Sequence, residues 1–340
     1  MKEEYTNSGI IVSIIMPLYN EEKYISNCID SLLRQTFCKK NMEWIFVDGN
    51  STDNTLNILK SYQKKYPDLI HIYNNPKKIV PHAMNIGIKH AMGKYIIRLD
   101  AHADYNYDYI DKCVYYLEHT DADNVGGIAR TKSNGFIGDA IAMMLSSKFG
   151  VGNSQFRING SSGYVDTVPF GAFRREVFER LGGYDERLIR NQDNEMNYRI
   201  RKNGGKIFLS QEIQFTYYCR DTILGLVDMA IKNGKWNIIT TYLCPGSMGI
   251  RHFIPLVFLM SLCLFIPLAF LSNLFLYLLG LELLLYFGLG FIFAVKATIK
   301  VQYILLIIVL FPVFHLSYGY GSLIGILNLV NYALQYSIKN

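Results

Sequence analysis

The chain has 340 residues, 18% of them charged, and a formal net charge of +6. This mild excess, without a dense Lys/Arg run, does not have the footprint of a nucleic-acid-binding protein, and we expect no nucleic-acid partner. Six cysteines without a C-x-x-C spacing argue against a zinc site or a disulfide framework and fit a reducing compartment. The first residues, MKEEYTNSG, lack a signal-peptide core, so we expect the water-soluble part to stay in the cytoplasm.

Strand and helix patterns alternate along the first hundred residues. β-Branched and apolar runs predict strands, and apolar side chains at helical spacing predict the helices between them. The strands are IIVSIIMP (10–17), the start of MEWIFVDGNSTDNT, IHIYNN and KYIIRLD, and the helices are 21–34, 53–66 and PHAMNIGIKHA. Such alternation with short loops predicts an α/β fold with a mostly parallel sheet. Ligands bind such sheets beyond the carboxyl ends of the strands, where Asp48 and Asp100 both stand.

Neither a G-x-G-x-x-G after the first strand nor a G-x-x-x-x-G-K-[ST] is present, which weakens a dinucleotide-binding or P-loop interpretation. A bound nucleotide would therefore be held by side chains and a cation.

The last ninety residues are strongly apolar. Phe253–Leu271 and Asn273–Val295 could each span a bilayer, and the basic residues at their outer ends place both ends on the cytoplasmic side. The stretch 301–338 is too long for one span and is interrupted by FPVFHLSYGYG, so one long tilted helix and two shorter pieces both remain possible. We expect three or four apolar segments and a multi-pass protein of the cell membrane.

The segment before the first span mixes apolar residues with Lys232, Lys235 and Trp236. This mixture predicts helices that lie on the membrane surface. The sequence thus divides into a cytoplasmic domain (1–220), an interfacial segment (221–252) and a transmembrane region (253–340).

The stretch YIIRLDAHADY places Asp100, His102 and Asp104 at every second position. In extended chain these side chains share one face. A carboxylate and an imidazole there can bind a divalent ion, either Mg²⁺ or, given the imidazole, Mn²⁺. The alternative is a histidine that only hydrogen-bonds its neighbour. Asp104 either supports such a site or belongs to a turn.

A third acid, Asp193, stands in RNQDNEMNYRIRKNGG, where a helix is predicted to begin. The positive end of the helix dipole would keep this carboxylate ionised. Taken alone, an aspartate after a strand or before a helix is more often a turn or cap residue, as we expect for Asp53.

In this order and spacing, VSIIMPLYNEEKYISNCIDSLLRQTF, EWIFVDGNSTDNT and GKYIIRLDAHADY resemble the family 2 glycosyltransferases with a GT-A fold. The segments NPKKIVPHAMNIGI, VPFGAFRREVFERLGGYDERLIRNQDNEMNYRIRKNGGKIF and GKWNIITTYLCPGSMGIRHFIP are similar to membrane-attached enzymes of bacterial succinoglycan and related exopolysaccharide synthesis. The resemblance covers about residues 10 to 255.

The resemblance implies a sugar-nucleotide donor, a divalent cation (Mn²⁺ or Mg²⁺) and inverting transfer to a hydroxyl; UDP is favoured, and GDP stays open. It implies that Asp193 is the general base, and that Asp100 and His102 hold the metal. The donor pocket would comprise Pro17, Tyr19, Asn20, Glu21, Asp48, Asn85 and Asp100. The acceptor side would comprise Phe170, Gly171, Ala172, Gln192, Lys235 and Trp236.

Two departures from the family pattern are visible. Gln192 stands where an acid is commoner, which leaves the base itself intact. The Q-x-x-R-W of processive synthases is reduced to NGKW, so we expect transfer of a single sugar to a lipid-linked saccharide in exopolysaccharide or capsule synthesis. The alternatives are a polyprenyl-phosphate glycosyltransferase and a non-catalytic nucleotide-sugar-binding subunit. Polysaccharide assembly proteins are possible partners.

Overall fold

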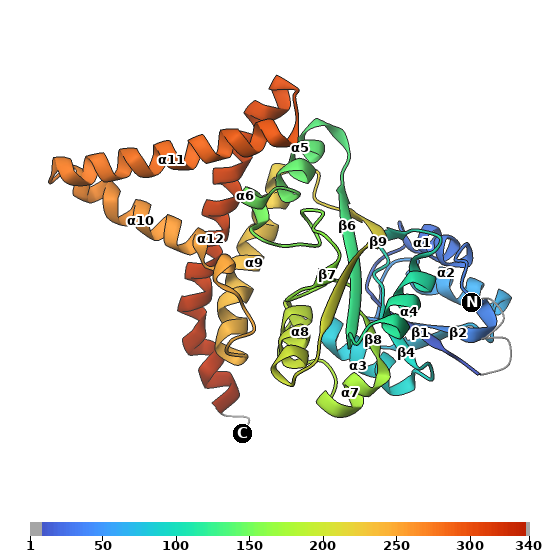
Figure 1. Cartoon of the computed structure of the whole chain (residues 1–340). Coiled ribbons are helices and arrows are strands. Elements are labelled where there is room, and N and C mark those ends of the chain that lie inside the picture. The colour runs from blue at the N-terminus through green and yellow to red at the C-terminus, as the bar shows by residue number, and fades with distance from the viewer. Residues whose placement is uncertain (1–8, 338–340) are drawn as a thin grey trace. The chain divides into compact units, whose positions relative to one another are not determined.

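The computed structural model describes residues 9–337, with side chains described as far as Leu329. The described chain forms two compact units (Figure 1). Unit 1 comprises residues 9–130 and 159–217, and unit 2 comprises residues 131–158 and 218–337. The predicted division at residues 220 and 252 concerns function rather than compactness and stays a prediction.

Unit 1 is an α/β unit built on a mixed sheet with the strand order β3-β2-β1-β4-β8-β6-β9-β5, and β7 pairs with β9. Parallel pairing joins β3, β2, β1 and β4, whereas β8 runs antiparallel to β4 and β6. The strands are β1 (Val12–Leu18), β2 (Met42–Asp48), β3 (Ile70–Asn74), β4 (Tyr95–Arg98), β5 (Ala103–Tyr105), β6 (Asn124–Lys132), β7 (Gly163–Tyr164), β8 (Ala172–Arg174) and β9 (Ile207–Tyr218). The strands and the parallel pairing predicted for the first hundred residues are confirmed.

The helices of unit 1 also match the predicted ones over the first hundred residues. They are α1 (Ile25–Leu33), η1 (Lys39–Asn41), α2 (Thr55–Lys65), α3 (Val80–His90), α4 (Tyr109–His119), α7 (Arg175–Leu181) and α8 (Gln192–Lys202). Every residue of β2 is buried, as expected for a parallel strand covered on both faces. Gly87 lets α3 approach β1 closely, because a Cβ there would lie 2.4 Å from Cγ2 of Ile15.

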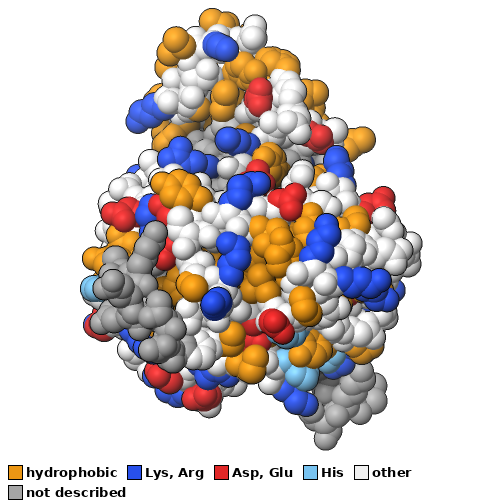
Figure 2. Space-filling view, turned by 90° about the vertical axis from the view of Figure 1, so that its right-hand side faces the viewer, with side chains coloured by type: hydrophobic (Ala, Val, Ile, Leu, Met, Phe, Trp, Pro, Cys, Tyr) orange, Lys and Arg blue, Asp and Glu red, His pale blue; other side chains and the backbone are white. Residues whose placement is uncertain are grey.

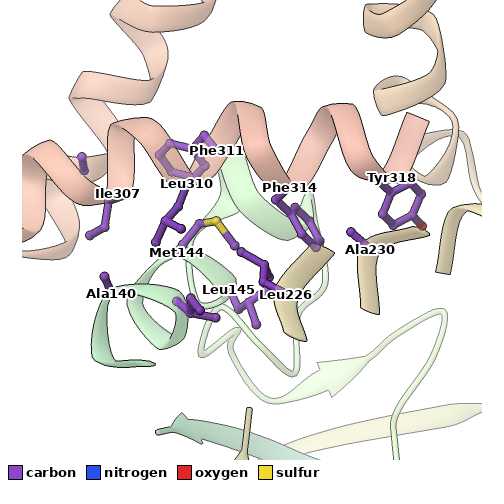
Figure 3. Close-up of a cluster of buried hydrophobic side chains, with 12 residues drawn as sticks. Ala140, Met144, Leu145, Leu226, Ala230, Ile307, Leu310, Phe311, Phe314 and Tyr318 are labelled. Atoms are coloured by element: carbon purple, nitrogen blue, oxygen red, sulfur yellow. The ribbon is translucent and has the colours of Figure 1, made fainter. Parts of the chain in front are cut away.

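Unit 2 is helical: α5 (Gly135–Leu145), α6 (Lys148–Val151), α9 (Ile223–Leu243), η2 (Ile250–His252), α10 (Ile254–Ala269), α11 (Asn273–Ala297) and α12 (Val301–Ser337). Glycines let α9 and α12 pack closely, since a Cβ on Gly234 would lie 2.0 Å from the carbonyl oxygen of Tyr318. A buried apolar cluster joins α5 and α9 to α12, with Met144 and Leu226 facing Leu310 and Phe314 (Figure 3).

The final segment, for which sequence left two possibilities, is one continuous helix, α12, which keeps Pro312 inside it. Two described helices are long and apolar enough to cross a membrane, α11 and the 301–329 part of α12. By contrast α10 has only 16 residues, fewer than the roughly 20 that a span needs, so the expected multi-pass arrangement is not supported. Figure 1 shows α10 and α11 as a hairpin.

Candidate active site

The carboxylates of Asp100 and Asp193 share one guanidinium. Arg98 ends β4 and is only 5% exposed. Its Nη2 lies 3.3 Å from Oδ1 of Asp100, and its Nη1 donates to Oδ1 of Asp193 in the first turn of α8. The two acids predicted as metal ligand and base therefore face the same small region, although they are 93 positions apart in the chain.

This arrangement has clear electrostatic consequences. Burial alone would lower the pKa of the Arg98 guanidinium, but the two carboxylates outweigh burial and raise it, so the arginine stays charged. Burial raises the pKa of Asp193 above the usual aspartate range, and Arg98 opposes that effect. A carboxylate with a raised pKa is a better proton acceptor than an ordinary surface aspartate. About a quarter of the Asp193 side chain (28%) stays accessible, so a substrate can reach it.

The predicted acceptor-side segment 170–172 lies directly beside Arg98. The register of β4 and β8 pairs Ile97 with Ala172, and the Arg98 N–H donates to the Gly171 carbonyl at 3.1 Å. The guanidinium lies 5.6 Å from the centroid of the Phe170 ring. Phe170 has a φ of +47°, a left-handed conformation that costs free energy in a bulky residue and is found most often at functional sites.

A buried amide pair fixes α8, and with it Asp193, to the sheet. The side-chain amide of Asn124 in β6 donates to Asn197 Oδ1 at 2.7 Å, and Asn197 donates in turn to the Val168 carbonyl at 3.0 Å. Both side chains are almost fully buried. Because both hydrogen bonds are buried, losing either would leave a further polar atom without a partner, so the pair stabilises the position of α8 on the sheet.

The segment after β4 keeps the alternation read from YIIRLDAHADY. Although a turn separates β4 from β5, residues 101, 103 and 105 are buried, whereas 100, 102 and 104 retain exposure. His102 Nδ1 lies 3.2 Å from Oε1 of Glu21, so the imidazole pairs with the carboxylate of that residue. The alternation of buried and exposed residues therefore persists, whereas the placement of Asp100, His102 and Asp104 on one face stays a prediction, because residues 101–102 form a turn rather than extended chain.

The side chains at this site could supply part of the ligand set of a divalent cation. Among the described residues no group of three His, Cys, Asp or Glu side chains could hold a metal by itself. However, Mg²⁺ and similar ions are commonly bound by one or two carboxylates and completed by substrate phosphates. Asp100, with His102 two residues later, could supply that partial set.

The predicted donor-pocket residues gather at the carboxyl ends of β1 and β2. Asn20 Oδ1 accepts from the Thr52 N–H at 2.8 Å, and the Glu21 N–H donates to Thr55 Oγ1 at 2.8 Å. Both oxygens of Asp48 accept from the Ser51 N–H, so this carboxylate also shapes its own turn. Pro17 pairs with Val47 in the sheet. Tyr19 is 47% exposed, and Nζ of Lys78 lies 5.4 Å from the centroid of the Tyr19 ring.

The remaining predicted residues differ in what they contact. Asn85 holds the 183–186 loop: its Oδ1 accepts from the Tyr184 N–H at 2.7 Å and its amide donates to the Tyr184 carbonyl at 2.9 Å. Oε1 of Gln192, the residue before Asp193, is buried and accepts no hydrogen bond from any described residue. Lys235 and Trp236 lie in α9 and belong to unit 2.

Sequence reasoning missed Arg98. The sequence feature that could have identified it is a single basic residue inside the apolar strand YIIRLD, two residues before Asp100. A buried arginine is rare unless it is paired, so its presence in a core strand indicates carboxylates that meet it from elsewhere in the fold. The partner from α8 could not be identified without the structure.

The mixed sheet, with the predicted functional residues along the rim of its parallel part, defines a GT-A-like fold, and solved structures support this assignment. The chain is similar in fold to the mannosyltransferase PcManGT from Pyrobaculum calidifontis, solved with GDP-Man and Mn²⁺ (TM-score 0.63, 19% identity, 89% of this chain and 87% of that one). It also resembles S. aureus TarS 1–349 solved with UDP (TM-score 0.51, 18% identity, 72% of each chain).

Sequence comparison gives the family. The model of Glycosyl transferase family 2 matches residues 13–182, half of the chain, and the protein belongs to that family. It is 29% identical over 326 residues to the dolichyl N-acetyl-alpha-D-glucosaminyl phosphate 3-beta-D-2,3-diacetamido-2,3-dideoxy-beta-D-glucuronosyltransferase of Methanococcus voltae (93% of this chain, 97% of the relative). It is 29% identical over 256 residues to succinoglycan biosynthesis protein ExoA of Rhizobium meliloti (75% and 76%). The protein is a glycosyltransferase, and the predicted family and fold are confirmed.

Proposed function

We propose that this glycosyltransferase moves one sugar, with inversion, from a nucleotide-sugar to a hydroxyl of a lipid-linked saccharide, and that it requires a divalent cation. The observation that carries the proposal is the shared guanidinium: Arg98 brings Asp100 and Asp193 to one place. Direct displacement needs one carboxylate near the leaving diphosphate and another near the incoming hydroxyl, and no covalent intermediate.

In the proposed reaction Asp193 accepts the proton of the acceptor hydroxyl as its oxygen bonds to the anomeric carbon. The bond from that carbon to the diphosphate oxygen breaks with its electron pair, and the nucleoside diphosphate leaves. A bound Mn²⁺ or Mg²⁺, held by Asp100 and His102, would neutralise charge on the leaving diphosphate. Arg98 orients both carboxylates through its two terminal nitrogens.

Names of relatives support the substrate classes. The Methanococcus voltae relative, matched over nearly its whole length, is named for an acceptor sugar carried on dolichyl phosphate. ExoA is named for succinoglycan synthesis, and TarS was solved with UDP. We infer a lipid-linked saccharide as acceptor and a UDP-sugar as donor; because PcManGT was solved with GDP-Man, GDP-sugars belong in the same test.

We further infer attachment to a membrane, above all through α11. Only 11% of its apolar window is buried, and side chains such as Leu284 (71% exposed) and Leu285 (57%) face outward along it. An apolar helix of 25 residues with that much exposure is stable only in a non-aqueous surrounding.

The proposal is tested with the full-length chain in detergent, a panel of UDP- and GDP-sugars, and two acceptor classes: lipid-linked saccharides and polyprenyl phosphates. We expect nucleoside diphosphate release to depend on the saccharide acceptor and on Mn²⁺. Asp193→Asn should lower transfer by about a hundredfold to ten-thousandfold while donor binding persists. Asp121→Asn, a surface carboxylate paired with Lys206, serves as control. Transfer to polyprenyl phosphate alone, or full turnover by Asp193→Asn, would overturn the proposal.

A further inference from the structure

Unit 2 contains a cationic pocket that the reaction chemistry above does not use. Its volume is about 830 Å³, and every residue that lines it belongs to residues 131–158 or 293–297. This volume is within the range of small-molecule sites. The pocket is therefore formed by unit 2 alone.

Three lysines from separate elements converge on this pocket. Lys132 ends β6, Lys148 opens α6, and Lys296 lies in the last turn of α11. None of the three forms an ion pair with a described residue. The lining contains a single carboxylate, Asp139, which accepts a hydrogen bond from the Tyr303 hydroxyl at 3.3 Å. Three cations against one anion leave an excess of two positive charges, which suits a doubly charged anion.

Apolar and hydroxyl groups complete the lining. Ala142, Met143 and Phe293 supply an apolar wall, while Ser146 adds a hydroxyl. The wall is held firmly, because neighbouring α5 residues Ala140 and Met144 pack on Ile307 and Leu310 of α12 (Figure 3). A pocket with both cations and apolar surface fits a ligand that carries an anion at the end of a hydrocarbon chain.

The place of the pocket along α11 indicates where that ligand comes from. Figure 1 shows α5 beside the C-terminal end of α11, and Lys296 and Ala297 of that end line the pocket. The preceding turns expose Ile292 (48%) and Val295 (43%), so the lysines stand where an outward-facing apolar helix ends. Lysines at such a boundary lie at the depth of lipid phosphate groups.

We propose that this pocket binds the phosphate or diphosphate group that joins a lipid chain to the acceptor saccharide. The inference rests on the proposed function and adds the site that holds the acceptor by its lipid end. The phosphate oxygens contact Lys132, Lys148 and Lys296, and the first carbons of the chain lie on Met143 and Phe293. Free diphosphate shares the anionic chemistry but not the apolar contact, and it binds more weakly.

Binding is measured with the full-length chain in nanodiscs of neutral phosphatidylcholine. Three probes are compared: a polyprenyl diphosphate at low mole fraction, phosphatidylglycerol at the same fraction, and inorganic diphosphate in solution. The variants are Lys132→Gln, Lys148→Gln, Lys296→Gln and the triple change. The matched control is Lys300→Gln, since Lys300 lies four residues beyond Lys296 but does not line the pocket.

We expect about a fivefold loss of polyprenyl diphosphate affinity for each lysine and about a hundredfold for all three, because each lysine near an anionic group is worth about 1 kcal/mol. Lys300→Gln should lose less than about twofold. Ala142→Trp, which keeps the charges but fills the apolar wall, should weaken the lipid probe and spare inorganic diphosphate. Equal binding by the triple variant, or equal affinity for phosphatidylglycerol and polyprenyl diphosphate, overturns the proposal.

A transfer assay separates this inference from the proposed function. In the triple variant the KM for the lipid-linked acceptor should rise while the KM for the nucleotide-sugar is unchanged. If the chain transfers sugar to lipid-linked acceptors but the triple variant has an unaltered acceptor KM, the pocket assignment is wrong and the function stands. If the lysines bind the probe but no lipid-linked saccharide is glycosylated, the function is wrong and the lipid-phosphate site stands.

Discussion

The two units of this protein differ in where they place charged and apolar side chains. Unit 1 buries charged groups and pairs them: Glu43, 1% exposed, accepts from the Ser13 hydroxyl at 2.6 Å, and Arg98 meets two carboxylates. Unit 2 instead turns large apolar side chains outward, as at Phe270 (88% exposed) and Leu284 (71%). The face of the molecule drawn in Figure 2 shows acidic, basic and apolar side chains interspersed.

This contrast indicates that the units are adapted to different surroundings. A buried charge is tolerated only with a partner, because taking it out of water costs several kcal/mol. An exposed leucine row is tolerated only where no water faces it. This contrast supports the proposal that sugar transfer takes place in unit 1 and that unit 2 contacts lipid. Substitutions that reverse either property test the contrast directly.

The largest effect is expected from removing the paired charge in unit 1. Arg98→Gln leaves Asp100 and Asp193 without their counterion, and breaking a buried ion pair costs about 3–5 kcal/mol of unfolding free energy. Arg98→Lys keeps the positive charge but cannot donate to both carboxylates from two separate nitrogens. We therefore expect this variant to fold and its rate of sugar transfer to fall by about tenfold to a hundredfold. Chemical unfolding and steady-state kinetics measure the two effects.

A pH profile distinguishes this role from simple packing. Burial raises the pKa of Asp193 and Arg98 lowers it, so removal of the arginine raises it further. A base with a higher pKa is protonated at higher pH, and the acidic limb of the kcat profile should therefore move upward in Arg98→Gln. If the acidic limb of the kcat profile is the same in Arg98→Gln and in the wild-type protein, the limb does not report the Asp193 carboxylate, and Asp193 does not act as the base.

A somewhat smaller effect is expected from removing the cation. Chelation should lower transfer by at least about a hundredfold, since a Lewis acid at a developing phosphate charge is worth several kcal/mol. Asp100→Asn should shift the Mn²⁺ concentration for half-maximal activity upward by about tenfold or more. Asp121→Asn is the matched control, because Asp121 is an exposed carboxylate paired with Lys206. Identical Mn²⁺ titrations for Asp100→Asn and wild type would remove Asp100 from the metal site.

Much of unit 1 could be predicted because its signals are local. Strand and helix spacing in 10–100, and acids at strand ends, need only neighbours in sequence to be interpreted. Arg98 could not be assigned because both its function and its tolerance in the core depend on α8, about ninety residues later. The role of Asn85 in holding the Tyr184 loop was missed for the same reason.

Unit 2 was harder to predict because hydropathy measures composition, not contacts. The sequence could not decide whether 301–338 is one helix, since Pro312 and FPVFHLSYGYG are typical breakers, yet α12 continues through them. Close packing on α9 through Gly234 and Gly321 supports this stretch from outside. Such support is a tertiary effect. In the first candidate span, Phe253–Leu271, the helix is shorter than the predicted segment, because α10 ends at Ala269 after 16 residues.

In unit 2 the opposite change, the introduction of a charge into the exposed apolar surface, tests the contact with lipid. Leu284→Arg lies near the middle of α11, where an arginine costs about 2.5–3.5 kcal/mol of membrane insertion. Ile299→Arg, beyond the end of α11 and 93% exposed, should cost little. The measurement is the fraction of full-length protein that stays in the membrane pellet after an alkaline carbonate wash. Equal retention of both variants would place α11 outside the hydrocarbon.

The smallest effect concerns a partly exposed ion cluster in unit 1. Burial alone would raise the pKa of Glu186, but hydrogen bonds from Lys77, Asn85 and His82 outweigh it and lower the pKa to about 2. A carboxylate with a depressed pKa stabilises the fold above its unfolded-state pKa and loses that contribution as pH falls towards 2. After screening, Glu186→Gln should lower the unfolding free energy by about 1–2 kcal/mol at pH 7.

The same comparison should vanish in acid. As pH falls from about 4.5 towards 2, the difference in unfolding free energy between the wild-type chain and Glu186→Gln should shrink and vanish, because the folded wild-type carboxylate becomes neutral only near its pKa of about 2. In a Trp236→Phe background only Trp44 remains as a fluorophore, and since it is buried in β2 it reports unfolding of unit 1 alone. Glu179→Gln, an exposed glutamate of α7, controls for loss of surface charge. If its pH dependence matches that of Glu186→Gln, net charge rather than the Lys77–Glu186–His82 cluster stabilises the loop next to Asn85.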